Sequence, residues 1–141
     1  MAPIERTANG VWRGDLRSGT GQIDSTSGVF RAIPFTFATR FENAKGTNPE
    51  ELIAAAHAGC YSMAFANYLN EHGHKPEEIA TAATITLENA VITKMHLVTR
   101  GRVPGLDAAS FARLAEEAEK QCPVSNLLRN GLTISLDASL M

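Results

Sequence analysis

The sequence predicts an α+β fold, with strands and helices in the order βββ-α-ββ-αα-β. Three observations predict this class. Apolar and polar residues alternate in several short stretches, which is the period of half-buried strands. The stretch from Asn48 to His72 carries the start and stop signals of a long helix. Helical spacing returns only after residue 107, so the helices are segregated from strands that we expect to pair antiparallel.

The first third of the chain is expected to form three strands. Residues 5–12 and 20–26 can form the first two, and GDLRSG at 14–19 supplies the glycine and aspartate of a hairpin turn between them. Residues 30–41 alternate apolar and polar side chains around Pro34 and form the third predicted strand. Because proline donates no backbone hydrogen bond, this strand is expected at an edge or to be irregular.

A long helix follows these strands. Asn48 is a good N-cap, Pro49 suits the first helical position, and Glu51 falls at the third. Glu50 and Glu51 complement the positive end of the helix dipole. Gly73 provides the C-terminal stop.

Five further elements complete the chain. They are two paired strands, two helices and a last strand, over residues 81–88, 91–103, 108–121, 123–131 and 132–138. Alternation in the paired strands is clearest at Ile85, Met95 and Leu97. Asp107 can cap the first of the two helices, and Pro123 can start the second, which stops at Gly131.

Length and composition limit the class of protein. With 141 residues, 44% of them hydrophobic and 20% charged, one domain over 1–141 with a sizeable core is expected. A net charge of −2 without a basic run lacks the signal of nucleic-acid binding. The first ten residues contain no apolar run typical of a secretory signal. Two cysteines 62 positions apart exclude a disulfide-dense scaffold and suit a reducing, cytoplasmic location.

The predicted long helix carries no charged side chain from Leu52 to Asn70. A helix without a charged face is normally buried on all sides, and a chain of this length has little material to wrap one. We therefore predict a homodimer, in which a second copy covers part of this helix. We reject a membrane span, because the stretch contains His57 and Asn67 and six of its nineteen residues are alanine.

Two cysteines are candidates for chemistry. Cys60 lies in the long helix, three residues after His57 and on the same face, where a positive neighbour would lower the pKa of the thiol. Cys122 precedes Pro123 and can be the N-cap of the next helix, whose positive end favours a thiolate. On spacing alone, two inert thiols packed in the core are at least as good an explanation of both cysteines as reactive thiols.

Other site types find little support. Arg40, at the end of the third predicted strand, could stabilise a thiolate or orient a carboxylate, but a surface arginine explains the position better. His57 and Cys60, together with Cys122 or His72, lack an established zinc spacing. The sequence has no glycine-rich phosphate loop, no GxSxG elbow and no nicotinamide or flavin signature. No cofactor or metal is therefore expected.

Several segments, taken together and in order, resemble one known family. They are WRGDLRSGTG (12–21), TRFENAKGTNPEEL (39–52), GTNPEELIAAAHAGCYSMA (46–64), VPGLDAASF (103–111) and CPVSNLL (122–128). On these motifs the chain resembles the OsmC/Ohr family of osmotically inducible and organic hydroperoxide resistance proteins over nearly its whole length. TRFE and GTNPEEL…HAGC resemble the OsmC branch.

The resemblance implies a fold and a set of site residues. The implied fold has antiparallel sheets wrapped around central helices in an intertwined homodimer, with the active site at the subunit interface. Cys60 matches the family's peroxidatic cysteine and Cys122 its resolving cysteine. Glu50 matches the catalytic glutamate, and Arg40 matches the arginine of the OsmC branch, with Arg17 as the reserve candidate.

The resemblance also implies a reaction that needs no haem or metal. Organic hydroperoxides, and more weakly hydrogen peroxide, would oxidise Cys60 to a sulfenic acid, which Cys122 resolves as an intramolecular disulfide. A dithiol or a lipoylated protein would reopen the disulfide. Glu50 and Cys60 are ten positions apart, about 15 Å along a straight helix. Either the arginine bridges them, or Glu50 reaches the Cys60 of the other subunit, or the helix bends.

Two rival functions stay open. The first is a non-enzymatic, stress-related binding dimer with inert thiols. The second is a thiol–disulfide oxidoreductase that acts on proteins, although the missing CxxC motif argues against it. No nucleic-acid or membrane partner is expected.

Overall fold

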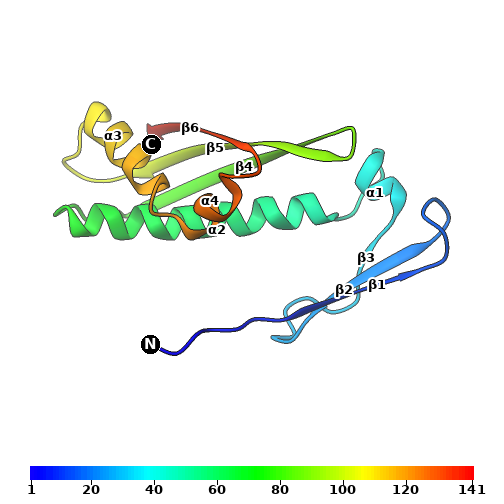
Figure 1. Ribbon diagram of the computed structural model, residues 1–141. Helices are drawn as coiled ribbons and strands as arrows, with labels where there is room; N and C mark the ends of the chain where they lie inside the picture. Colours follow the sequence, from blue (N-terminus) through cyan, green and yellow to red (C-terminus); the bar gives the residue numbers. More distant parts are fainter. The chain divides into compact units, whose positions relative to one another are not determined.

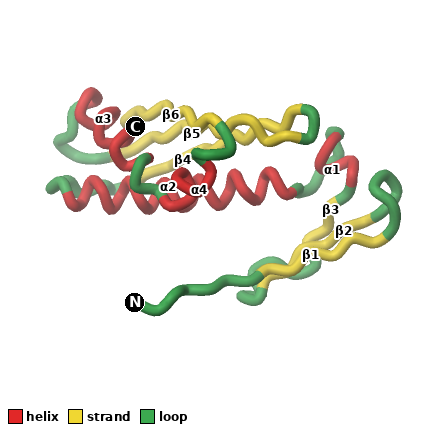
Figure 2. The backbone as a smooth tube through the Cα atoms, viewed as in Figure 1, coloured by secondary structure: helices red, strands yellow, loops and turns green.

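The structure is a computed structural model that describes all 141 residues, in two compact units, Met1–Leu52 and Ile53–Met141. Figure 1 shows the elements of both units, and Figure 2 colours the same backbone by helix, strand and loop. The element order matches the predicted order except for one additional short helix before the long one. A single domain over 1–141 stays a prediction.

The first unit contains a three-stranded antiparallel sheet. Its strands are β1 (Ala8–Arg13), β2 (Thr20–Ser25) and β3 (Ile33–Phe35), with β2 in the centre. The predicted hairpin turn between β1 and β2 is confirmed. The carboxylate of Asp15 accepts hydrogen bonds from two backbone N–H groups of the turn at 2.9 and 2.8 Å. Gly14 adopts a φ of 92°, in the left-handed region that favours glycine.

The prediction of one strand over residues 30–41 is wrong in its second half, where the chain forms helix α1 (Phe37–Phe41). The cause is local. The Thr36 hydroxyl accepts the N–H of Thr39 at 3.2 Å, and the Thr39 hydroxyl accepts the N–H of Thr36 at 2.9 Å. This reciprocal cap satisfies two backbone donors and starts a helix, which the alternation of residues conceals. Pro34 does lie in an edge strand, as expected.

The second unit contains a mixed sheet. β4 (Glu78–Glu88) pairs antiparallel with β5 (Val91–Arg102), as predicted, but β6 (Thr133–Leu140) pairs parallel with β5. The prediction of antiparallel pairing is therefore wrong for β6. Between β5 and β6 the chain passes through α3 (Ala108–Glu119) and α4 (Pro123–Leu128). A helical crossover of this length returns the chain in the same direction, which makes the pairing parallel.

The helices of the second unit cover one face of its sheet. From Ile53 onwards, α2 (Pro49–Glu71) lies along this face, as Figure 1 shows. The rings of Phe65 on α2 and Phe111 on α3 lie 5.0 Å apart in the core. The fully buried apolar side chains are Tyr61, Phe65, Leu69, Met95, Leu97, Phe111, Ala115, Ala118 and Cys122. None of the helices, α2 included, combines the length and hydropathy that a membrane span requires.

Gly101 of β5 permits close packing between the sheet and α3. A Cβ at this position would lie 2.6 Å from the Phe111 ring and 2.9 Å from Ile79. Core side chains are too densely packed to give way freely, so Gly101→Ala is expected to lower the free energy of unfolding by about 1–3 kcal/mol. A denaturant titration measures this. Gly10→Ala is the control, because a Cβ there meets nothing within 4 Å. Equal stability of the two variants would contradict the packing argument.

Candidate active site

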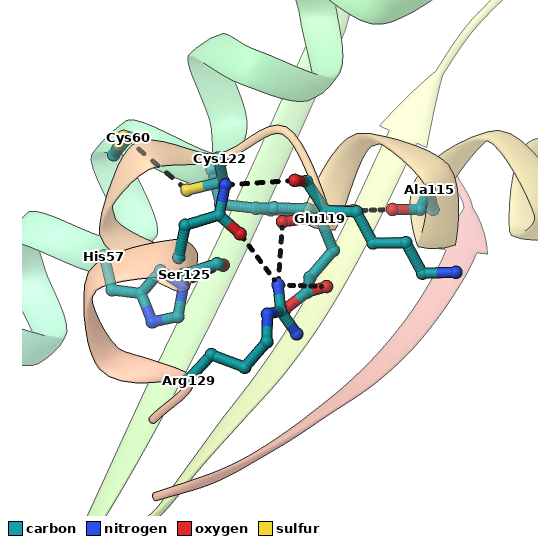
Figure 3. Close-up of polar contacts among 10 residues, drawn as sticks. His57, Cys60, Ala115, Glu119, Cys122, Ser125 and Arg129 are labelled. Carbon is teal, nitrogen blue, oxygen red and sulfur yellow. Dashed lines mark hydrogen bonds and ion pairs between the residues drawn. The ribbon is translucent and has the colours of Figure 1, made fainter. Parts of the chain in front are cut away.

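Helices α2 and α4 bring the two cysteines together. Cys60 lies half-buried in the middle of α2, and Cys122 is the fully buried N-cap residue of α4, as its position before a proline predicts. The two Sγ atoms are 3.6 Å apart, with both thiols free (Figure 3). A disulfide has an S–S distance of about 2.05 Å, so an approach of about 1.5 Å would join them.

The immediate surroundings of Cys60 act on its pKa in both directions. Burial is the largest effect and raises the pKa of the Cys60 thiol above its ordinary value. The backbone N–H of Val124, in the first turn of α4, bonds to the sulfur and lowers the pKa, whereas the neighbouring Cys122 raises it. The net direction is upward. Activation of Cys60 as a thiolate therefore requires a positive charge beyond these neighbours.

His57 is not that positive charge. The side chain is fully buried, and its Nε2 lies 2.7 Å from the hydroxyl of Ser125 on α4, while its Nδ1 has no hydrogen-bond partner. Burial lowers the pKa of His57 below 6.5, against an opposing effect of Glu119 and with a smaller lowering by Arg129. A pKa below 6.5 makes the neutral imidazole the predominant form at pH 7. The sequence-based suggestion of a positive neighbour at this position is therefore wrong.

The lowered pKa of His57 predicts a pH dependence of stability. Because the unfolded chain binds this proton more readily, the contribution of His57 is fully present above about pH 6.5 and is lost as the pH falls below it. We expect wild type to lose more stability than His57→Phe between pH 7.5 and pH 5.5. Denaturant midpoints at both pH values measure the difference. Parallel losses in the two proteins would contradict the assignment of a neutral, buried imidazole.

Arg40 and Glu50 form the second pair, within the first unit. Arg40 lies on α1, and its Nη2 and Nε donate hydrogen bonds to Oε1 of Glu50 at 2.7 and 3.0 Å. Glu50 is buried in the first turn of α2, where Asn48 accepts the N–H of Glu51 at 2.8 Å. Asn48 is thus the N-cap that the sequence predicts. Glu50 lies at the start of a helix and accepts two hydrogen bonds from one guanidinium, so its carboxylate has a fixed orientation.

The reserve candidate Arg17 makes a different contact. Its guanidinium lies 4.8 Å from the centroid of the Phe37 ring, a cation–π contact. The structure thus pairs Glu50 with Arg40 and not with Arg17.

An apolar hollow borders Cys60. It has a volume of about 270 Å³ and is lined by Cys60, Met63, Ala64, Asn67 and Pro123. Nearly all of its lining is apolar, which suits an apolar substituent better than a charged one. No group of three or more His, Cys, Asp or Glu side chains comes together in an arrangement that could hold a metal ion.

Sequence reasoning missed three polar residues near the cysteines. Ser125 is fully buried on α4, and Glu119 of α3 forms an ion pair with Arg129 at 2.9 Å. Figure 3 shows these side chains below the cysteine pair. No local spacing links a serine to a histidine 68 positions away, so the sequence carries no signal for this contact.

Comparison with known proteins gives consistent matches. The model of the OsmC family, described as OsmC-like protein, matches residues 42–137. Peroxiredoxin OsmC of Escherichia coli (strain K12) is 42% identical over 135 residues, which cover 93% of this chain and 94% of that protein. An organic hydroperoxide resistance protein of Xanthomonas axonopodis pv. citri is 28% identical over 97 residues, covering 64% and 66%. The crystal structure of OhrB of Bacillus subtilis, an organic hydroperoxide resistance protein, superposes with a TM-score of 0.69 at 26% identity, covering 94% and 97%.

Proposed function

The chain belongs to the OsmC family of peroxiredoxin-like peroxidases, and we propose that it reduces organic hydroperoxides to alcohols through a Cys60–Cys122 thiol cycle. The observation that carries this proposal is the 3.6 Å separation of the two sulfurs. Cys60 is half-buried and borders an apolar hollow, whereas Cys122 is fully buried. An accessible cysteine next to a protected one suits successive oxidation and resolution.

The proposed cycle has three steps. The Cys60 thiolate attacks the distal oxygen of the hydroperoxide; an S–O bond forms, the O–O bond breaks, and the leaving alkoxide takes up a proton to become the alcohol. The Cys122 thiol then attacks the sulfenic sulfur, so that an S–S bond forms and hydroxide leaves as water after taking the thiol proton. An external dithiol or lipoylated protein reopens the disulfide by thiol–disulfide exchange.

Arg40 and Glu50 have supporting roles in this proposal. A guanidinium keeps its charge at all working pH values, lowers the pKa of a nearby thiol and can donate hydrogen bonds to peroxide oxygens as charge develops on them. Glu50 holds Arg40 by two short hydrogen bonds, which fixes the direction of the guanidinium. We assign Arg40 as the residue that activates Cys60 and Glu50 as the residue that orients Arg40.

A homodimer is part of the same proposal. The uncharged stretch of α2 leaves Ala55, Ala56 and Gly59 exposed, and Met63 is 76% exposed. Apolar and small side chains on the open face of a helix without charges favour coverage by another apolar surface. A second copy of the chain supplies one, and light scattering at micromolar concentration would measure the expected dimer mass.

Peroxide removal under matched conditions tests the proposed function. We expect the protein to remove tert-butyl hydroperoxide faster than hydrogen peroxide, with a dithiol reductant supporting turnover better than a monothiol. The apolar hollow beside Cys60 is the reason for the first preference. If neither peroxide is removed while Cys60 stays reduced, the protein is a binding dimer with inert thiols. If disulfide exchange with protein substrates outpaces reaction with peroxide, the protein is an oxidoreductase of proteins.

A further inference from the structure

We propose that His57 and Ser125 are positioning residues for the resolving step. Their buried hydrogen bond fixes α4 against α2 and thereby holds Cys122 within reach of Cys60. The inference rests on the proposed thiol cycle and assigns a role within it to a pair that takes no part in the chemistry itself.

The geometry is that of two matched cross-links between the same two helices. On α2, His57 precedes Cys60 by three residues, and on α4, Cys122 precedes Ser125 by three residues. Residues at this spacing lie one helical turn apart on one face. The nitrogen–oxygen contact of 2.7 Å and the sulfur–sulfur contact of 3.6 Å therefore lie side by side, as Figure 3 shows. A shift of α4 that breaks the first contact also moves the second.

Helix α4 depends on such contacts for its position. It has only six residues and lacks a side-chain hydrogen bond at its N-cap. A helix this short does not persist without tertiary contacts. On one side, Arg129 donates to the Glu119 carboxylate at 2.9 Å and Asn126 donates to the carbonyl of Lys120 at 3.1 Å, both towards α3. Towards α2, the histidine–serine bond is the one nitrogen–oxygen side-chain contact that α4 makes.

The pair is also costly to bury. Both side chains are fully buried, and Nδ1 of His57 has no partner. A buried polar atom without a hydrogen bond destabilises a fold, whereas an apolar pair of the same shape can be neutral or better. The bond therefore fixes the position of α4 more than it stabilises the fold, because it forms only when α4 lies at one place on α2.

Position matters most after Cys60 has been oxidised. The sulfenic acid then has two fates, condensation with Cys122 or further oxidation to the sulfinic acid by a second peroxide. Condensation is intramolecular, and its rate depends steeply on geometry, so that a misplacement of about 1 Å can cost about 10²-fold. The attack on peroxide needs Cys60 and not Cys122. The position of α4 acts on this step through the Val124 N–H, which bonds to the Cys60 sulfur, and through Pro123 at the hollow, and we expect this effect to be smaller than the effect on condensation.

Single-turnover oxidation of Ser125→Ala tests the inference. After one equivalent of tert-butyl hydroperoxide, we expect Cys60 to be oxidised nearly as fast as in wild type but the disulfide to form about 10²-fold more slowly. A dimedone-type probe should then trap sulfenic acid on Cys60, and excess peroxide should yield sulfinic acid, as mass spectrometry of the Cys60 peptide measures. Tyr68→Phe is the matched control, because it removes a 2.7 Å bond from α2 to Glu117 of α3 without touching α4; it should resolve like wild type.

A second variant covers the case in which Ser125→Ala is unstable. The double variant His57→Phe, Ser125→Ala keeps an aromatic ring at position 57 and leaves no polar partner unpaired. We expect its disulfide to form as slowly as in Ser125→Ala. Disulfide formation at the wild-type rate in these variants would overturn the inference and leave the proposed function standing. If wild type itself forms no disulfide, the proposed function fails and the inference with it.

Discussion

Cys60→Ser is expected to abolish hydroperoxide reduction, with a loss of at least about 10³-fold in kcat/KM. Serine is almost fully protonated at neutral pH and is a poor nucleophile toward peroxide oxygen. Cys122 cannot take over, since its side chain is fully buried, whereas Cys60 borders the hollow. Peroxide consumption with a dithiol reductant measures the loss.

Cys122→Ser is the matched comparison for that experiment. It retains Cys60 and should consume its first equivalent of peroxide at a normal rate. It then stalls, because the sulfenic acid has no partner and proceeds to the sulfinic acid under excess peroxide. If Cys60→Ser still turned over while Cys122→Ser lost the first equivalent, the roles of the two cysteines would have to be exchanged.

Arg40→Lys is expected to lower kcat/KM by about 10²-fold, the second-largest effect. Lysine keeps the positive charge, but a single ammonium cannot reproduce the two contacts that the Arg40 guanidinium makes with Glu50 at 2.7 and 3.0 Å. The remaining charge is then no longer held in one direction by Glu50, which weakens the role that we propose for Arg40. Glu50→Gln should produce a smaller loss, because the amide still accepts one hydrogen bond from Arg40.

Two further arginine variants make the result specific. Arg102→Lys changes an exposed ion pair with Glu78 at 3.1 Å and should leave peroxide reduction unchanged. Arg17→Lys separates the two candidate arginines. If Arg17→Lys caused the large loss and Arg40→Lys did not, the assignment of the activating arginine to Arg40 would be wrong.

Much of the fold follows from local signals in the sequence. The long helix begins after Asn48 and ends before Gly73, as capping chemistry predicts, because both residues act on the backbone next to them. The strands β4 and β5 match their predicted alternation for the same reason. Elements whose cause lies within a few residues are thus readable from the chain.

Two features of the fold could not be predicted from local sequence patterns. Thr36 and Thr39 form a reciprocal cap for α1, but threonine is not the glutamate or glutamine usual at the second position of that motif, and alternation around Pro34 suggested a strand. The parallel pairing of β6 is set by the path of the chain through α3 and α4. The residue pattern within β6 does not indicate whether the neighbouring strand runs parallel or antiparallel to it.

Some residues of the candidate site could likewise be predicted from the sequence, and others could not. Pro123 marked Cys122 as an N-cap residue, and the resemblance to the OsmC family singled out both cysteines, Arg40 and Glu50. The partner of His57 could not be predicted, since Ser125 comes from a helix 68 positions away. The charge state of His57 cannot be predicted from spacing, because burial, which lowers its pKa, is a property of the packed chain.

The most direct test of the account is a count of free thiols before and after peroxide. Reduced wild-type protein should show two thiols per chain, and one equivalent of tert-butyl hydroperoxide should leave none. Peptide mapping should find Cys60 joined to Cys122 within one chain, and a non-reducing gel should show no linked dimer. Two thiols remaining after peroxide would contradict the cycle, because sulfurs placed 3.6 Å apart for this reaction would not have reacted.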